Sequence, residues 1–342
     1  ATVYFTTKAS DANYPEYTYL VEGANESNYN IKIVYPEAGV PTVYLNEAYL
    51  YNDVGFTFGS ADYPDTPLNI VIEGEKDSYI RAGDDYYHGA LDLRTTADVN
   101  ISSVDNARLE LMSSDYYEPD GTLSSNGNIN ITNANLVFRF DNKWPGTNGI
   151  MSKGGNVVID NSKVIIWGRY FEVNSNGSVT DATNSYDVKN GIKVTADANG
   201  NGGQLIIQNN SDVLILVEES PVAVSAENGT IISNSNVEIG TKFETAKIFD
   251  NNVELVYVGS YHAVASTTST RIKSDVNYTL NPPTNCVEFV SANSTDYRYF
   301  KVEYLHEHEY AAVVTAPTCT EHGFTTYTCS CGETYKDNIV AA

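Results

Sequence analysis

Aromatic side chains recur just before glycine-containing turns, each beside a carboxylate or another polar group. An aromatic ring can cover the apolar C–H face of a sugar, while carboxylates, amides and amines bond its rim of hydroxyls. Covering the ring releases water from apolar surface, which favours binding. The residues predicted to bind a glycan in this way are Tyr86, Tyr87, Tyr116, Tyr117, Trp144, Trp167, Tyr170, Asp85, Asp115 and Lys143.

These aromatic positions belong to a repeat, which predicts how they are arranged. One order recurs along the chain: a turn, a short strand, a middle strand, a corner that contains Asn, and a third strand. The spacings between successive middle strands are 30, 28, 48 and 25 residues, counted at Ile101, Ile131, Ile159, Ile207 and Ile232. Three short strands in about 25 to 30 residues are typical of one rung of a parallel β-helix.

We therefore expect an all-β protein, a right-handed parallel β-helix (a solenoid) followed by a small C-terminal β module. Stacked rungs align their inward Ile, Val and Leu into one core, which a single rung cannot form. The corner Asn residues are expected to adopt the left-handed conformation and to stack into ladders. A β-sandwich is the alternative, but a sandwich gives no reason for strands and corners to repeat in one order.

The repeat also predicts domain boundaries and a groove. Residues 1–28 are expected to form an N-terminal cap or flanking strand, residues 29–290 the β-helix, and residues 291–342 the C-terminal Cys/His module. The long spacing is explained by a loop insertion at residues 168–190. Because rungs lie about 4.8 Å apart, aromatic residues at equivalent positions should form a line, with the insertion as one wall of a groove.

The charge balance restricts the partners. Lys and Arg number 20 against 44 Asp and Glu, a net charge of −24. This field repels nucleic acid and anionic membranes, and the sequence has no apolar run long enough to insert into a bilayer. A neutral polysaccharide is favoured, starch or another α-glucan first. Pectin comes second, because its carboxylates would need bridging Ca²⁺, for which Asp84 and Asp85 are candidates. We expect a monomer that is part of a larger surface protein or complex.

Two other classes of function remain open. Parallel β-helices also host polysaccharide lyases and glycoside hydrolases that act on pectin-like glycans, and hydrolysis needs two carboxylates about 5 to 10 Å apart. Asp84 or Asp85 could reach that distance from Asp115 on the next rung, but acidic residues in turns are normally solvated. We therefore predict no catalytic residue and no required cofactor. The second alternative is a structural spacer, which predicts no glycan binding.

Three cysteines and a histidine near the C-terminus form a candidate metal set. His308, Cys319, Cys329 and Cys331 could hold a structural Zn²⁺, whose tetrahedral sites use thiolate and imidazole ligands. Their spacing departs from the Cys-x₂-Cys pairs of zinc ribbons. A disulfide from Cys319 to Cys329 or Cys331 is the second alternative, and free thiols are the third. Zinc or a disulfide would hold a module that is too small for a core of its own.

Short motifs in two stretches carry a resemblance to known proteins. In residues 43–111 they are Val43-Tyr44-Leu45, Asn69-Ile70-Val71-Ile72-Glu73-Gly74, Gly89-Ala90-Leu91 and Val99-Asn100-Ile101, and in residues 306–340 they are Pro317-Thr318-Cys319 and Cys329-Ser330-Cys331-Gly332. Residues 43–111 resemble secreted carbohydrate-binding β-helix proteins of clostridial and ruminococcal gut bacteria. Residues 306–340 are similar to a small module repeated on surface proteins of the same bacteria. Both resemblances imply adhesion to plant polysaccharides, pectin and starch among them, and a secreted or cell-surface location.

Overall fold

The fold is known from a computed structural model of the chain. The residues it describes are 16–17, 31–34, 40–52, 55–58, 65–82, 89–113, 121–140, 148–173, 179–181, 190–217, 222–242, 244–274, 276–305, 310–329 and 334–341. They form two compact units: residues 1–256 with 263–303, and residues 257–262 with 304–342. The predicted start of the C-terminal module, residue 291, falls inside the first unit.

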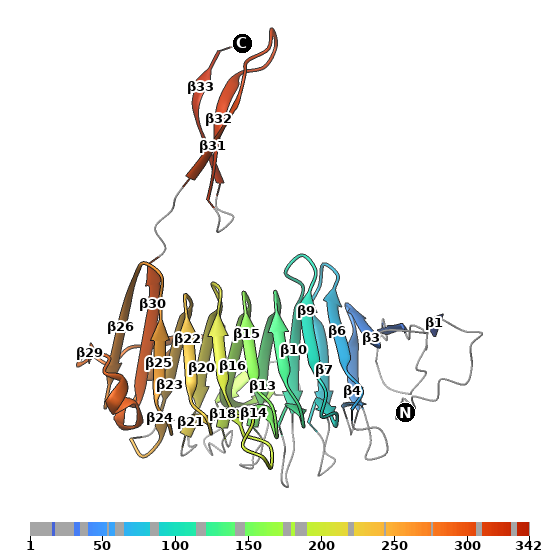
Figure 1. Ribbon diagram of the computed structural model, residues 1–342, viewed down its shortest axis with the longest axis vertical. Helices are drawn as coiled ribbons and strands as arrows, with labels where there is room; N and C mark the ends of the chain where they lie inside the picture. The colour runs from blue at the N-terminus through green and yellow to red at the C-terminus, as the bar shows by residue number, and fades with distance from the viewer. Residues whose placement is uncertain are drawn as a thin grey trace. The chain divides into compact units, whose positions relative to one another are not determined.

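Parallel sheets of stacked strands form the first unit (Figure 1). Each rung gives one strand to each of three sheets, as with β9 (Val99–Ser103), β10 (Arg108–Ser113) and β11 (Leu123–Ser125). Each of these strands pairs in parallel with its equivalents one rung before and one rung after. The predicted fold class, a parallel β-solenoid with a small C-terminal β module, is confirmed.

The strands fall into sheets as follows. The first sheet contains β1 (Glu16–Tyr17), β2 (Ile31–Val34), β3 (Thr42–Asn46), β6 (Leu68–Glu73), β9, β12 (Ile129–Thr132), β15 (Val157–Asp160), β19 (Leu205–Gln208), β22 (Thr230–Ser233) and β25 (Val253–Val256). The second contains β4 (Tyr49–Asn52), β7 (Ser78–Ala82), β10, β13 (Asn135–Phe140), β16 (Lys163–Val173), β20 (Asp212–Val217), β23 (Asn236–Thr241), β30 (Tyr299–Leu305), β26 (Ser260–Ser266) and β29 (Val287–Glu288), with β17 (Val179–Asp181) paired to β16.

The third sheet contains β5 (Phe56–Phe58), β8 (Leu91–Leu93), β11, β14 (Asn148–Ser152), β18 (Asn190–Val194), β21 (Val222–Ala226) and β24 (Lys247–Phe249). Three further elements complete the chain: the hairpin of β27 (Arg271–Ser274) and β28 (Thr279–Asn281), the 3₁₀ helix η1 (Ser291–Asp296), and the antiparallel sheet of β31 (Tyr310–Thr315), β32 (Gly323–Cys329) and β33 (Thr334–Val340). No described helix is long and apolar enough to cross a bilayer.

The register of the sheets follows the repeat in the sequence. The five middle-strand isoleucines, Ile101, Ile131, Ile159, Ile207 and Ile232, are direct partners from rung to rung. All five are buried, so they form one continuous file of the core. Their alignment removes apolar surface from water in every rung, which is the main term that stabilises such a stack.

Asparagines turn the chain at the corner before the second sheet. The corner residues Asn106, Asn133, Asn161, Asn210 and Asn234 have φ between 44° and 63°, as predicted. Asn tolerates this left-handed region better than other residues with a side chain. The predicted ladders are also present: the amide of Asn161 donates to Oδ1 of Asn133 at 2.6 Å. A second ladder lies on the first sheet, where the amide of Asn130 donates to Oδ1 of Asn100, and the amide of Asn100 donates to Oδ1 of Asn69.

Antiparallel strands lie at both ends of the stack. At the N-terminal end, β2 runs antiparallel to β3, and β1 pairs with β2. At the C-terminal end, β30 runs antiparallel to β23. The buried Tyr299 of β30 donates its hydroxyl to Oε1 of Glu238 at 2.8 Å. Burial raises the pKa of Glu238, although this bond and the nearby Lys301 oppose the rise.

The corner conformation gives a first prediction. Asn133→Ala should lower the free energy of unfolding by about 1–2 kcal/mol relative to Asn133→Gly, because alanine resists the left-handed region. Both variants lose the ladder bond to Asn161, so their difference isolates the backbone effect. Urea unfolding of the full chain measures it. Equal midpoints for the two variants would contradict the explanation.

The Glu238 contact gives a pH-dependent prediction. A carboxyl with a raised pKa in the folded state supports folding while it is protonated and loses that contribution as the pH rises through the folded pKa. The wild type should therefore lose stability relative to Glu238→Gln as the pH rises above about 4, the ordinary range of a glutamate, until the Glu238 carboxyl is ionised in the folded state. The measurement is the unfolding midpoint of both proteins at several pH values. A stability difference that stays constant with pH would refute this explanation.

Candidate functional site

Most of the predicted glycan-binding residues lie outside the described part of the chain, and they stay predictions. They are Tyr86, Tyr87, Tyr116, Tyr117, Trp144, Asp85, Asp115 and Lys143. The candidate Ca²⁺ ligand Asp84 also lies there. Tyr170 follows a bulge in β16, where its backbone partners Phe140. The predicted insertion contains an antiparallel pairing of β16 with β17.

Trp167 is placed by the structure, and the prediction that it lines an exposed aromatic row is wrong. Its side chain is 0 % exposed. The hairpin β27–β28 covers this part of the second sheet, and the ring of Tyr278 meets Trp167 edge-on at 5.5 Å between centroids. The residues buried together in this second apolar cluster are Val137, Ile165, Trp167, Leu216, Leu280 and Tyr299.

The earlier rungs of the second sheet present two tyrosines on the outer face. Tyr49 on β4 and Tyr79 on β7 are direct register partners and are 40 % and 36 % exposed. Their rings meet edge-on, with 6.2 Å between centroids. The repeat did not single them out, because both tyrosines lie inside strands and not before turns. The alternation along β7, with Ser78 and Ile80 buried on either side of Tyr79, is the signal that could have found them.

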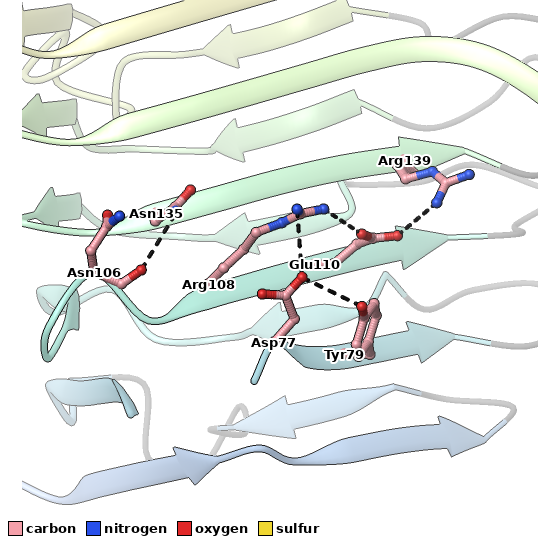
Figure 2. A network of polar contacts seen from close by, with 7 residues as sticks. All are labelled: Asp77, Tyr79, Asn106, Arg108, Glu110, Asn135 and Arg139. Carbon is pink, nitrogen blue, oxygen red and sulfur yellow. Dashed lines mark hydrogen bonds and ion pairs between the residues drawn. The ribbon is translucent and has the colours of Figure 1, made fainter. Parts of the chain in front are cut away.

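An ionic network lies beside Tyr79 (Figure 2). Arg108 reaches Oε2 of Glu110 at 2.8 Å and Oδ2 of Asp77 at 3.5 Å. Arg139 reaches the other oxygen of Glu110 at 3.0 Å, and the Tyr79 hydroxyl donates to Asp77 at 3.4 Å. These ion pairs and the tyrosine hydrogen bond span three rungs, and they restrain the side chains that take part in them.

The name Tyr79 face is used below for Tyr49, Asp77, Tyr79, Arg108, Glu110 and Arg139. Glu110 is its most enclosed member, with 4 % exposure, and it accepts from two guanidinium groups. Burial alone would lower the pKa of Arg108, but Asp77 and Glu110 raise it above the ordinary value. Burial raises the pKa of the Tyr79 hydroxyl, and Asp77 and Glu110 add to the rise. The tyrosine therefore stays a neutral donor, and the arginine stays charged.

A depression of about 320 Å³ adjoins the Tyr79 face. It lies at the corners of two successive rungs, and two members of the face, Asp77 and Arg108, line it. Carboxylate, guanidinium, amide and backbone groups meet an open space there, a short distance from an exposed aromatic ring. Its lining residues are Gly74, Glu75, Lys76, Asp77, Val104, Asp105, Asn106, Ala107 and Arg108.

Of the four predicted zinc ligands, the structure describes Cys319 and Cys329, and it keeps these two apart. Cys329 is the register partner of Tyr310 at one end of the β31–β32 hairpin, whereas Cys319 lies in the turn beyond the Thr315–Phe324 pair at the other end. Five residues of strand separate the two ends by about 17 Å, too far for one zinc ion or one disulfide. Cys329 is buried and Cys319 is exposed. The described residues hold no group of three or more His, Cys, Asp or Glu suited to a metal.

The other two members of that set, His308 and Cys331, lie outside the described residues. A zinc site that includes them stays a prediction, without Cys319.

Neither the family models, nor the curated proteins, nor the solved structures compared with this chain give a match.

The network gives a prediction about stability. Glu110→Gln should lower the free energy of unfolding by about 1–3 kcal/mol, because it leaves two partly buried guanidinium groups without their shared charge. Glu303→Gln is the matched control, since Glu303 forms an exposed ion pair with Lys301. Such surface pairs contribute less than about 1 kcal/mol. Equal losses for the two variants in denaturant unfolding would show that Glu110 does not organise the face.

Proposed function

We propose that this protein binds a neutral polysaccharide without cleaving it, and that the Tyr79 face is part of the binding surface. Starch or another α-glucan is the favoured ligand. The observation that carries the proposal is the exposed pair Tyr49–Tyr79 beside fixed carboxylate and guanidinium groups. The predicted aromatic residues before the turns, Tyr86, Tyr116 and Trp144 among them, extend this proposal but do not carry it.

The chemistry of a sugar matches such a surface. A pyranose ring has an apolar C–H face that an aromatic ring can cover, and its hydroxyls need hydrogen-bond partners once water leaves. Tyr79 supplies a ring, and Asp77 and Arg108 supply an acceptor and donors next to it. Because ion pairs already hold these side chains, binding would cost little side-chain entropy.

The local charge favours a neutral ligand over pectin. The depression beside the face carries three carboxylates, Glu75, Asp77 and Asp105, against two cations, Lys76 and Arg108. Net charge there is thus negative, like that of the whole chain. A uronate would have to overcome this field or bring Ca²⁺, whereas a glucan would not.

Adhesion is the role that fits this activity. The proposed binder would be a secreted or cell-surface protein, or part of a larger complex, that attaches a bacterium or its enzymes to plant polysaccharide. The resemblance to carbohydrate-binding β-helix proteins of gut bacteria supports this role, and so does the resemblance of the C-terminal residues to surface-protein modules.

Affinity electrophoresis of the full chain in gels that contain starch, pectin or cellulose tests the proposal. Starch should retard the wild type most. Tyr79→Ala and Tyr49→Ala should each weaken binding by about 1–3 kcal/mol, on the scale of ring stacking. Tyr44→Ala is the matched control, because Tyr44 lies on the first sheet, away from the Tyr79 face, and should leave retardation unchanged.

The outcomes separate the alternatives. Retardation by none of the three polysaccharides would refute the proposal and favour a structural spacer. Release of reducing ends during incubation would favour a glycan-cleaving enzyme. If binding survives both tyrosine substitutions, the binding site lies outside the Tyr79 face.

A further inference from the structure

We infer, on the basis of the proposed function, that the hairpin β27–β28 closes one end of the Tyr79 face. The site would then hold a short end segment of a neutral glycan chain, with Tyr278 as its terminal contact. This differs from the extended row of rings that the repeat predicts.

The hairpin is a fixed wall. Its two strands pair antiparallel, and Leu280 on β28 is buried in the cluster with Trp167 and Leu216. Ile272 on β27 packs against the same cluster. Burial of these apolar side chains holds the hairpin on the sheet, so a glycan could not displace it without exposing Trp167 to water.

Tyr278 occupies the position where the wall meets the face. Its backbone has a φ of 46°, a left-handed conformation that is costly for a residue with a large side chain. Its ring packs on Trp167, and its hydroxyl lies near Arg139, Glu110 and Arg108. A phenol held in this way presents a donor and an acceptor to the last sugar that the face can hold.

The register fixes the length of the open floor. One outward row runs through Tyr49, Tyr79 and Glu110 and continues to Val137 and Ile165. The last two are buried in the cluster with Trp167. The hairpin therefore leaves three rungs uncovered: β4 and β7, which carry the exposed rings, and β10, where Glu110 is 4 % exposed and its ion-pair partner Arg108 provides the accessible side chain. These rungs span about 10 Å at a rung spacing of about 4.8 Å, enough for about three sugar units in an extended chain. Within the described residues the second sheet begins at β4.

A wall at one end has a measurable consequence. A chain that could slide through an open groove would gain contacts or alternative registers with every added sugar. A chain that stops at Tyr278 meets no further rung of the second sheet beyond the third unit, among the residues that the structure describes. Affinity should therefore depend on length only for short ligands.

Isothermal titration calorimetry with malto-oligosaccharides of one to seven units tests this inference on the full chain. Affinity should rise about tenfold or more from one to three units and change by less than about twofold from four to seven units. Tyr278→Phe keeps the ring and removes the hydroxyl. It should weaken the three-unit ligand several-fold and leave the two-unit ligand nearly unchanged.

Tyr299→Phe is the matched control, because Tyr299 belongs to the same buried cluster but its hydroxyl bonds Glu238. Any effect of this control should be the same for all lengths. Affinity that keeps rising to seven units, or a Tyr278→Phe effect that is independent of length, would overturn the wall and leave the proposed function standing. Binding at no length, with cello-oligosaccharides and oligogalacturonides also inactive, would overturn both.

Discussion

Each strand of the solenoid obtains its backbone hydrogen bonds from strands one rung away, and the rest of the structure depends on this constraint. Backbone groups inside a stack must be paired, so successive rungs keep a common register. Ile101 and Ile131 therefore face the same interior file, and Asn133 and Asn161 turn at the same corner. The core, the corners and the ladders are consequences of one spacing repeated along the chain.

The same constraint shapes the outer surface. Outward side chains one rung apart come into contact range, so a tyrosine pair can form between β4 and β7, and ion pairs can link the rungs of β7, β10 and β13. The accessible part of this surface then depends on which rungs stay uncovered. The hairpin β27–β28 covers the later rungs and buries Trp167, while Tyr49 and Tyr79 remain exposed. The candidate site is the part of a regular face that this hairpin leaves free.

Much of the fold could be predicted because its period is visible in the sequence. Three strands per rung, the corner Asn residues and the middle-strand isoleucines follow from local pattern alone. The site was harder to predict. Trp167 is covered by a segment more than a hundred residues later, and periodicity cannot show such a contact. Cys319 and Cys329 are near in sequence, but the hairpin places them at opposite ends. The tyrosines before the turns lie outside the described residues, so the predicted line of rings stays untested.

The antiparallel strands at the two ends of the stack have a consequence for assembly. A bare end of a parallel solenoid is a row of unpaired N–H and C=O groups, which another copy could extend in register, as happens in cross-β fibres. In the first sheet β2 runs antiparallel to β3, and in the second sheet β30 runs antiparallel to β23, so one sheet at each end breaks the parallel hydrogen-bond pattern of the stack. A rung of a second copy that extended all three sheets in parallel would meet a reversed strand in one of them at either end, which disfavours stacking of copies end to end.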